Sequence, residues 1–205
     1  MNLLVQHGVP FLFLANQPCL DFINTDLVMN GQPTDLLSSF QALVAWLVQA
    51  GLLTEKDAAR IEGGGGHDAM ETLKQAKAFR STMRNMAERL AARKPVPQAA
   101  LALINQLLRH RIGYAQVTRR NGMFERRYEA GFEDANHVLG LLAEAASDLL
   151  CTCDLSLVKQ CQNPACVLFF YDTTKNHARH WCSMDLCGNR SKVAAHYRRH
   201  RKRRT

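Results

Sequence analysis

Four cysteines near the C-terminus of the 205-residue chain have the spacing of metal ligands. They form two pairs with four residues inside each pair and fifteen between the pairs: Cys161, Cys166, Cys182 and Cys187. Two thiolate pairs at this separation match the tetrahedral four-cysteine zinc pattern. Because four cysteines leave no open position on the metal, we predict one structural Zn²⁺ rather than a catalytic one.

The residues around these cysteines predict how the pairs meet. Asn163-Pro164 favours a turn inside the first pair, and Ser183 is placed to N-cap a helix that begins at Met184 and carries Cys187 in its first turn. A short strand is expected over Val167–Tyr171. His177 and His180 are the rival ligands, and we expect both on a loop that faces solvent or phosphate. The C-terminal part is therefore predicted to be a small zinc finger of treble-clef-like strand, turn and helix.

Charge is concentrated in the same part of the chain. From Lys159 to Thr205 there are eleven Lys and Arg against two Asp and Glu, a net charge of +9. The first 158 residues hold fifteen Lys and Arg against sixteen Asp and Glu, a net charge of −1. A basic segment of this kind indicates a polyanionic partner, most often nucleic acid. The alternative is a solvated tail that only aids solubility.

The helix predicted from Met184 to about Arg201 has two different faces. Its inner stripe is expected to be Leu186, Val193, Ala194 and Tyr197. Its outer face is basic, because Lys192, His196, Arg199 and Arg203 recur at helical steps, with Arg198 and Lys202 beside them. We predict that this face binds nucleic acid, and duplex DNA in particular, through phosphates or the major groove.

The first 150 residues are predicted to be mainly α with one β-hairpin. Apolar residues at helical spacing indicate helices over 36–50, 69–92, 99–109 and 132–150, with a short one from Thr54 to the glycine run at 63–66. Met70 is placed on the apolar stripe of the second of these. Alternation over 113–130 around Asn121-Gly122 predicts the hairpin.

This organisation predicts two domains. Residues 1–150 form the helical body, residues 151–156 a hinge and residues 157–205 the zinc finger. Cys151 and Cys153, at the end of the last body helix, either bind metal as well or are buried structural thiols, and we favour buried thiols because free Cys is among the most buried residue types. The apolar stretch near the N-terminus is too short for a membrane span or a signal peptide, so we expect a cytoplasmic protein that binds no membrane.

Two polar residues interrupt the apolar N-terminal segment. Asp21 and Asn24 either contact a small-molecule effector or satisfy buried backbone groups, and we favour the second role because such residues commonly take it. The chain shows no nucleophile–base pair, no H-E-x-x-H sequence and no phosphate-binding loop, so an enzyme is not expected.

Two motifs resemble known families. Cys187-Gly188-Asn189-Arg190, with Trp181-Cys182 before it and Lys192 after it, resembles the signature of the CGNR zinc finger. Leu20-Asp21-Phe22-Ile23-Asn24-Thr25 is similar to the motif that opens the bacterial ABATE domain. The resemblance implies a bacterial stress-induced transcription regulator with the four cysteines as zinc ligands.

These observations favour a transcription regulator whose helical body senses a ligand or forms a homodimer and whose finger binds DNA. A second hypothesis is binding of RNA or the ribosome through the same basic tail. An enzyme in the N-terminal body is the third and least favoured.

Overall fold

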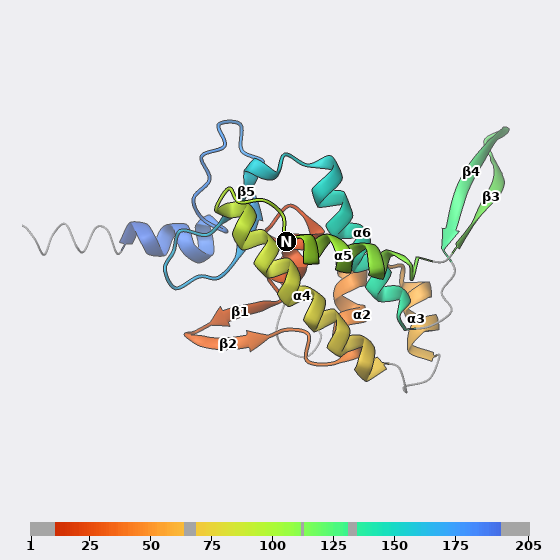
Figure 1. Ribbon diagram of the computed structural model, residues 1–205, viewed down its shortest axis with the longest axis horizontal. Helices are drawn as coiled ribbons and strands as arrows, with labels where there is room; N and C mark the ends of the chain where they lie inside the picture. The colour runs from red at the N-terminus through yellow and green to blue at the C-terminus, as the bar shows by residue number, and fades with distance from the viewer. Residues whose placement is uncertain (1–10, 64–68, 112, 131–134, 194–205) are drawn as a thin grey trace, which may run out of the picture.

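The structure, a computed structural model, describes residues 11–63, 69–111, 113–130 and 135–193. The described chain is mainly helical and adds three short antiparallel strand pairs. Figure 1 shows the helices packed together in the middle, the β3–β4 hairpin at one end of the longest axis and the last described helix at the other.

The helices begin and end close to where the sequence predicts. They are α2 (Phe40–Gln49), α3 (Glu55–Gly63), α4 (Ala69–Ala91), α5 (Gln98–Leu108) and α6 (His137–Thr152). Ser39 caps α2 by accepting a hydrogen bond from the Ala42 N–H at 3.1 Å. Thr54 caps α3 in the same way from the Asp57 N–H. Both caps use the hydroxyl oxygen for a backbone donor that the first helical turn leaves unpaired.

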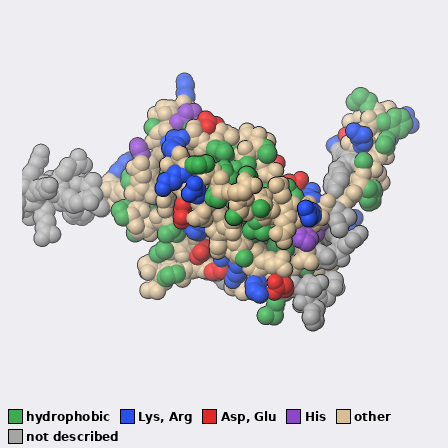
Figure 2. Space-filling model, viewed as in Figure 1, with side chains coloured by type: hydrophobic (Ala, Val, Ile, Leu, Met, Phe, Trp, Pro, Cys, Tyr) green, Lys and Arg blue, Asp and Glu red, His purple; other side chains and the backbone are tan. Residues whose placement is uncertain are grey.

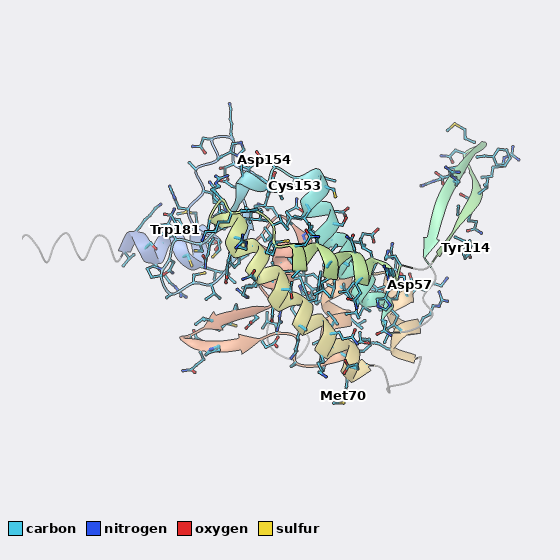
Figure 3. All side chains as sticks on the ribbon, in the orientation of Figure 1. Asp57, Met70, Tyr114, Cys153, Asp154 and Trp181 are labelled. Carbon is cyan, nitrogen blue, oxygen red and sulfur yellow. The ribbon has the colours of Figure 1, made fainter. Side chains whose placement is uncertain are left out.

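A short helix at the start of the chain lies in the centre of the core. Helix α1 (Pro18–Ile23) begins with proline, which suits a first helical turn, and its residues after Pro18 are buried. It packs against α4 and α6. Phe22 contacts the rings of Trp46 and Phe79, which come from α2 and α4. One expected core residue is wrong: Met70 is 82% exposed, because it lies in the first turn of α4, where that helix extends beyond the body (Figure 3).

The predicted hairpin is present over the expected residues. Strands β3 (Gly113–Arg120) and β4 (Met123–Ala130) pair around Asn121-Gly122, and both turn residues have positive φ. This conformation favours Asn-Gly because the glycine has no Cβ to clash. The structure adds a hairpin that the sequence reading did not include, β1 (Asp26–Met29) with β2 (Gln32–Asp35), around Asn30-Gly31.

The C-terminal part packs directly on the helical body. After a 3₁₀ turn at Leu155–Leu157, strand β5 (Val158–Gln160) pairs with β6 (Phe169–Tyr171). Strand β5 contacts α4 and β6 contacts α1, and Phe169 and Phe170 belong to the same core as Phe22 and Phe79. The division at residues 150 and 157 stays a prediction, but the two parts share one hydrophobic core.

The segment predicted as a hinge differs from expectation in its thiols. Cys151 lies inside α6 and is exposed, and Cys153 is half-buried and accepts a hydrogen bond from the Gln17 side chain at 3.2 Å. The expectation that both are buried is therefore wrong. Leu149 is the last fully buried residue of α6, and Leu150 still packs against the core, whereas Cys151 and Thr152 lie on the exposed side of the last turn. Within the described ranges, none of the helices has the length and apolar character that crossing a membrane requires.

Candidate metal centre and nucleic-acid interface

The four predicted cysteines meet in one cluster. The Sγ atoms of Cys161, Cys166, Cys182 and Cys187 all lie within 4.8 Å of one another. The Sγ atom of Cys182 is 3.6 Å from that of Cys187 and 3.8 Å from that of Cys166. At a Zn–S distance of about 2.3 Å, two sulfurs of a regular tetrahedron lie about 3.8 Å apart. The cluster therefore has the dimensions of a four-cysteine zinc site and can hold one metal ion.

Asn163 builds the turn that brings the first pair together. Its side-chain oxygen accepts from the Ala165 N–H at 3.1 Å, and its backbone carbonyl accepts from the Cys166 N–H at 2.8 Å. The side-chain amide donates to the Cys187 sulfur at 3.3 Å. Asn163 thus closes the loop between Cys161 and Cys166 and also contacts Cys187 of the second cysteine pair. Such a hydrogen bond to a ligand sulfur orients it toward the metal position.

The second pair is positioned by a capped helix, as predicted. The Ser183 hydroxyl accepts from the Leu186 N–H at 3.0 Å, and Met184 to Gly188 form a π-helical turn that continues as α-helix to Val193. Cys187 lies in this first turn, at the N-terminal end of the helix. A Cβ at position 188 would lie 2.6 Å from the Met184 sulfur and 3.2 Å from the Trp181 ring, so glycine allows this close packing.

The electrostatics of the cluster fit a bound cation. Burial raises the pKa of the Cys161 thiol to about 11. The hydrogen bond from Cys182 lowers the pKa of Cys166 to about 5, and the same contact raises the pKa of Cys182 well above its usual range. Burial and the contact with Cys166 therefore oppose ionisation of Cys161 and Cys182 when no cation is bound. A divalent cation removes this penalty, because all four sulfurs can then be thiolates.

Arg179 supports the second pair from the loop between the pairs. Its guanidinium donates to the carbonyls of Cys182, Trp181 and Leu14, the last two at 2.9 Å. Its charge lies 4.2 Å from the centre of the Phe170 ring, which is a cation–π contact. The sequence reading did not identify this residue. The only local signal was an arginine between two cysteine pairs, which does not reveal its partners.

Asp172 organises the same loop. It is fully buried and accepts from the Lys159 ammonium at 2.6 Å and from the backbone N–H groups of Thr174 and Arg179. Burial opposes its ionisation, but these hydrogen bonds outweigh burial and hold the pKa of Asp172 below its usual range. His177 and His180 are exposed, as expected, and neither belongs to the cysteine cluster.

Asp21 and Asn24 both bind backbone groups. Asp21 accepts from the N–H groups of Leu14 and Ala15, each at 2.9 Å. Asn24 pairs with Phe169 in both directions: its amide donates to the carbonyl at 2.8 Å and its oxygen accepts from the N–H at 2.9 Å. These bonds fit the favoured role of satisfying buried backbone. The two Asn24 bonds also link the N-terminal segment to the finger, which the sequence did not indicate.

The predicted basic face is described only at its start. Lys192 is exposed, as is Arg190. Val193, which we expected on the inner stripe, is 54% exposed, so its assignment is wrong, whereas Leu186 is half-buried against the core. The remaining predicted residues lie outside the described part of the chain: His196, Arg198, Arg199, Lys202, Arg203, Ala194 and Tyr197.

Two cavities adjoin the cysteine cluster. The first, of about 670 Å³, lies between the N-terminal segment and the finger loop and is lined by Phe13, Asn16 and Trp181 among others. The second, of about 250 Å³, lies between the β1–β2 hairpin and the finger, with Val28 and Arg190 in its lining. Figure 3 shows Trp181 within the finger, beside the last described helix.

Two family models match the chain. Residues 16–152 match ABATE, described as "Putative stress-induced transcription regulator". Residues 158–200 match the CGNR zinc finger. No curated protein matches the chain.

Proposed function

Because the chain belongs to the ABATE family and its C-terminal segment matches the CGNR zinc finger, we propose that it is a transcription regulator that binds duplex DNA. The zinc finger presents the DNA-binding helix, and the helical body senses a ligand or forms a homodimer. Both matched families are of regulator or zinc-finger type rather than enzymes.

The observation that carries this proposal is the junction between the cysteine cluster and the basic segment. Cys187 lies in the first turn of the last described helix, and Arg190 and Lys192 follow it at the surface. From Asn189 to Thr205 the sequence holds eight Lys and Arg and no Asp or Glu. A basic segment without acids has no internal partners for its charges, so it suits a polyanion.

A bound zinc ion would supply the folding energy that such a small finger lacks. Residues of the chain position the DNA-binding helix and attach the finger to the body. Cys187 and the Ser183 cap anchor the start of the helix, and Arg179 ties the finger to the N-terminal segment. Lys192, His196, Arg198, Arg199, Lys202 and Arg203 are the proposed nucleic-acid contacts.

An effector would act where the body meets the finger. The cavities described above are lined from both parts of the chain, and the N-terminal segment that holds Asp21 and Asn24 forms hydrogen bonds with the finger. We propose that a small molecule or a second copy changes DNA binding by shifting this junction. Asp21 and Asn24 would contribute by positioning the backbone there.

A salt titration on duplex DNA tests the proposal. If Lys192, Arg198, Arg199 and Lys202 each bind one phosphate, the log–log slope of affinity against salt is about −3.6, at roughly 0.9 per contact. Arg199→Ala should make the slope shallower by about 0.9 and weaken all sequences alike. Fluorescence anisotropy on zinc-loaded protein measures both quantities.

Lys74→Ala is the matched control, because Lys74 is an exposed cation on α4, away from the finger. It should leave affinity and slope unchanged. Equal slopes for wild type and Arg199→Ala would contradict the proposed contact. Tighter binding to single strands or to A-form RNA, with a weaker salt response, would favour the RNA-binding alternative.

A further inference from the structure

The β3–β4 hairpin stands apart from the rest of the molecule. In the described chain the two strands pair only with each other, and Figure 1 shows them projecting from the helical body. A two-stranded ribbon without further support is at best marginally stable in water. Its exposed edges also invite pairing with other chains. A projecting ribbon of this length therefore indicates a role in binding rather than in stabilising the fold.

The ribbon exposes large apolar side chains together with cations. The exposed fractions are 63% for Tyr114, 65% for Val117, 72% for Met123 and 74% for Phe124. Figure 2 shows apolar and basic side chains gathered on the projecting hairpin, and Figure 3 places Tyr114 near its base. Several exposed apolar side chains on one small element mark an interaction surface.

The strand register divides these side chains between two faces. Directly opposed residues share a face, and Val117 opposes Arg126 while Arg119 opposes Phe124. We call the face with Ala115, Val117, Arg119, Phe124 and Arg126 the acid-free face. The Arg119 guanidinium lies 5.6 Å from the centre of the Phe124 ring on it. The opposite face carries Arg120 and Met123 at its tip, with Glu125 next along β4.

This separation distinguishes a binding face from simple protection against aggregation. Charges that only block edge pairing have no need to be sorted by face. Among the described side chains of the ribbon, the one acid, Glu125, lies on one face, and the other face combines two arginines with a phenylalanine. An acid-free face with arginines on either side of an aromatic ring is suited to a polyanion.

We propose that the acid-free face of the β3–β4 ribbon is a second DNA-contacting surface that docks on duplex DNA. The inference rests on the proposed function. The major groove of B-DNA, about 12 Å wide, admits a two-stranded ribbon. Arg119 and Arg126 bind phosphates on the groove edge, and Phe124 between them contacts sugars or thymine methyl groups in the groove.

Charge complementarity favours DNA over a second copy of the chain as the occupant. Duplex DNA carries one negative charge for about every 1.7 Å of its axis. The first 158 residues, which would supply most of the surface of a second copy, have a net charge of only −1. The arginines of the ribbon would therefore meet far more negative charge on duplex DNA than on a second copy of the chain.

The test compares Arg119→Ala and Arg126→Ala with Arg120→Ala in the full-length, zinc-loaded protein. Arg120 is the matched control, because it lies on the same ribbon but on the opposite face. Each change on the acid-free face should lower the salt slope on duplex DNA by about 0.9 and weaken binding about 5- to 10-fold at 0.1 M salt. Arg120→Ala should change neither. Phe124→Ala should weaken binding without changing the slope, since it removes no phosphate contact.

The ribbon lies outside the core, so thermal melts and zinc content should match wild type in all four variants. Wild-type binding that is unaffected by Arg119→Ala and Arg126→Ala would overturn this inference and leave the proposed function intact. Absence of wild-type binding to duplex DNA would overturn both. An equal loss in Arg120→Ala would overturn the acid-free face as the site. If Phe124→Ala converts a dimer to a monomer in sedimentation while DNA binding is unchanged, the ribbon docks on a second copy and the inference is wrong.

Discussion

Of the seven cysteines, four share one cluster and three lie elsewhere. Cys166→Ser should reduce bound zinc from about one per chain to well below one, because a hydroxyl is a much poorer zinc ligand than a thiolate. Cys151→Ser is the matched control: this thiol is exposed on α6 and outside the cluster. Metal analysis after washing with a weak chelator measures the difference. An equal loss of zinc in both variants would contradict the ligand assignment.

The buried carboxyl of Asp21 predicts how the free energy of unfolding changes with pH. Burial raises its pKa to about 6, although the N–H groups of Ala15 and Leu14 and the charge of Arg179 oppose the shift. Between pH 4 and 6 the folded state therefore holds a proton that the unfolded state has lost, so Asp21 lowers the free energy of unfolding as pH rises. The total effect is roughly 3 kcal/mol, at 1.36 kcal/mol per pKa unit.

Asp21→Asn keeps an oxygen acceptor but does not titrate. Wild type should lose stability relative to this variant as pH rises from about 4 to 6, with no further change above pH 7. Protonation of the cysteines affects both proteins, so the difference between their urea midpoints isolates Asp21. A difference that stays constant over this range would show that the carboxyl titrates normally.

At the scale of elements, helix α4 joins the body to the finger through one side chain. The Arg84 guanidinium donates to the carbonyls of Ile23 and Asp26 at 2.7 and 2.6 Å, and to that of Val167 at 3.2 Å. Val167 directly follows Cys166 in the finger. Arg84 therefore joins the end of α1, the start of β1 and the finger to helix α4. Its ring contact with Phe169 adds to this joint.

Replacing Arg84 by Met should lower the free energy of unfolding by about 2–4 kcal/mol, because half-buried carbonyls lose charged donors. Arg89→Met on the same helix is the control, since within the described part of the chain Arg89 donates only to the exposed carbonyl of Pro95. It should change stability by about 0.5 kcal/mol or less. Urea denaturation followed by circular dichroism compares the two. Equal effects would mean that α4 is not the joint.

At the scale of the whole molecule, the question is whether the body folds without the finger. The sequence predicts that residues 1–150 form a stable domain, and this stays a prediction. The structure favours dependence, because β5 and β6 pack on α4 and α1 and because Asn24 binds the backbone of Phe169. Removing the finger would uncover the sides of α4 and α1 that β5 and β6 pack on and would remove the Phe169 partner of Asn24.

We therefore expect a fragment of residues 1–156 to melt less cooperatively and at lower temperature than the full chain. The full chain should show one transition whose midpoint rises with free zinc, since zinc binds the folded cluster more tightly than the unfolded chain. Calorimetry of both proteins, with and without chelator, measures this. A sharp transition of the fragment at the full-length temperature would restore the two-domain prediction.

The sequence alone determined the features that depend on neighbours along the chain. The spacing of the four cysteines, the turn at Asn163-Pro164 and the Ser183 cap predicted the metal cluster, because each pair needs only a local loop. Asn121-Gly122 predicted the hairpin for the same reason, and helical periodicity placed α4 and α6 within a few residues.

Only the tertiary structure decided which residues far apart in the sequence contact one another. Three sets of bonds join segments more than 55 residues apart: the pairing of Asn24 with Phe169, the bonds of Arg84 to three carbonyls and the bond of Arg179 to Leu14. Helical periodicity likewise placed Met70 and Val193 on apolar stripes. It did not show that each stripe extends past the part of the helix that the core covers, so both side chains are exposed. The reason is physical: a local pattern determines which residues share a face, but burial depends on whether another element covers that face, and the covering element is chosen by packing of the whole chain.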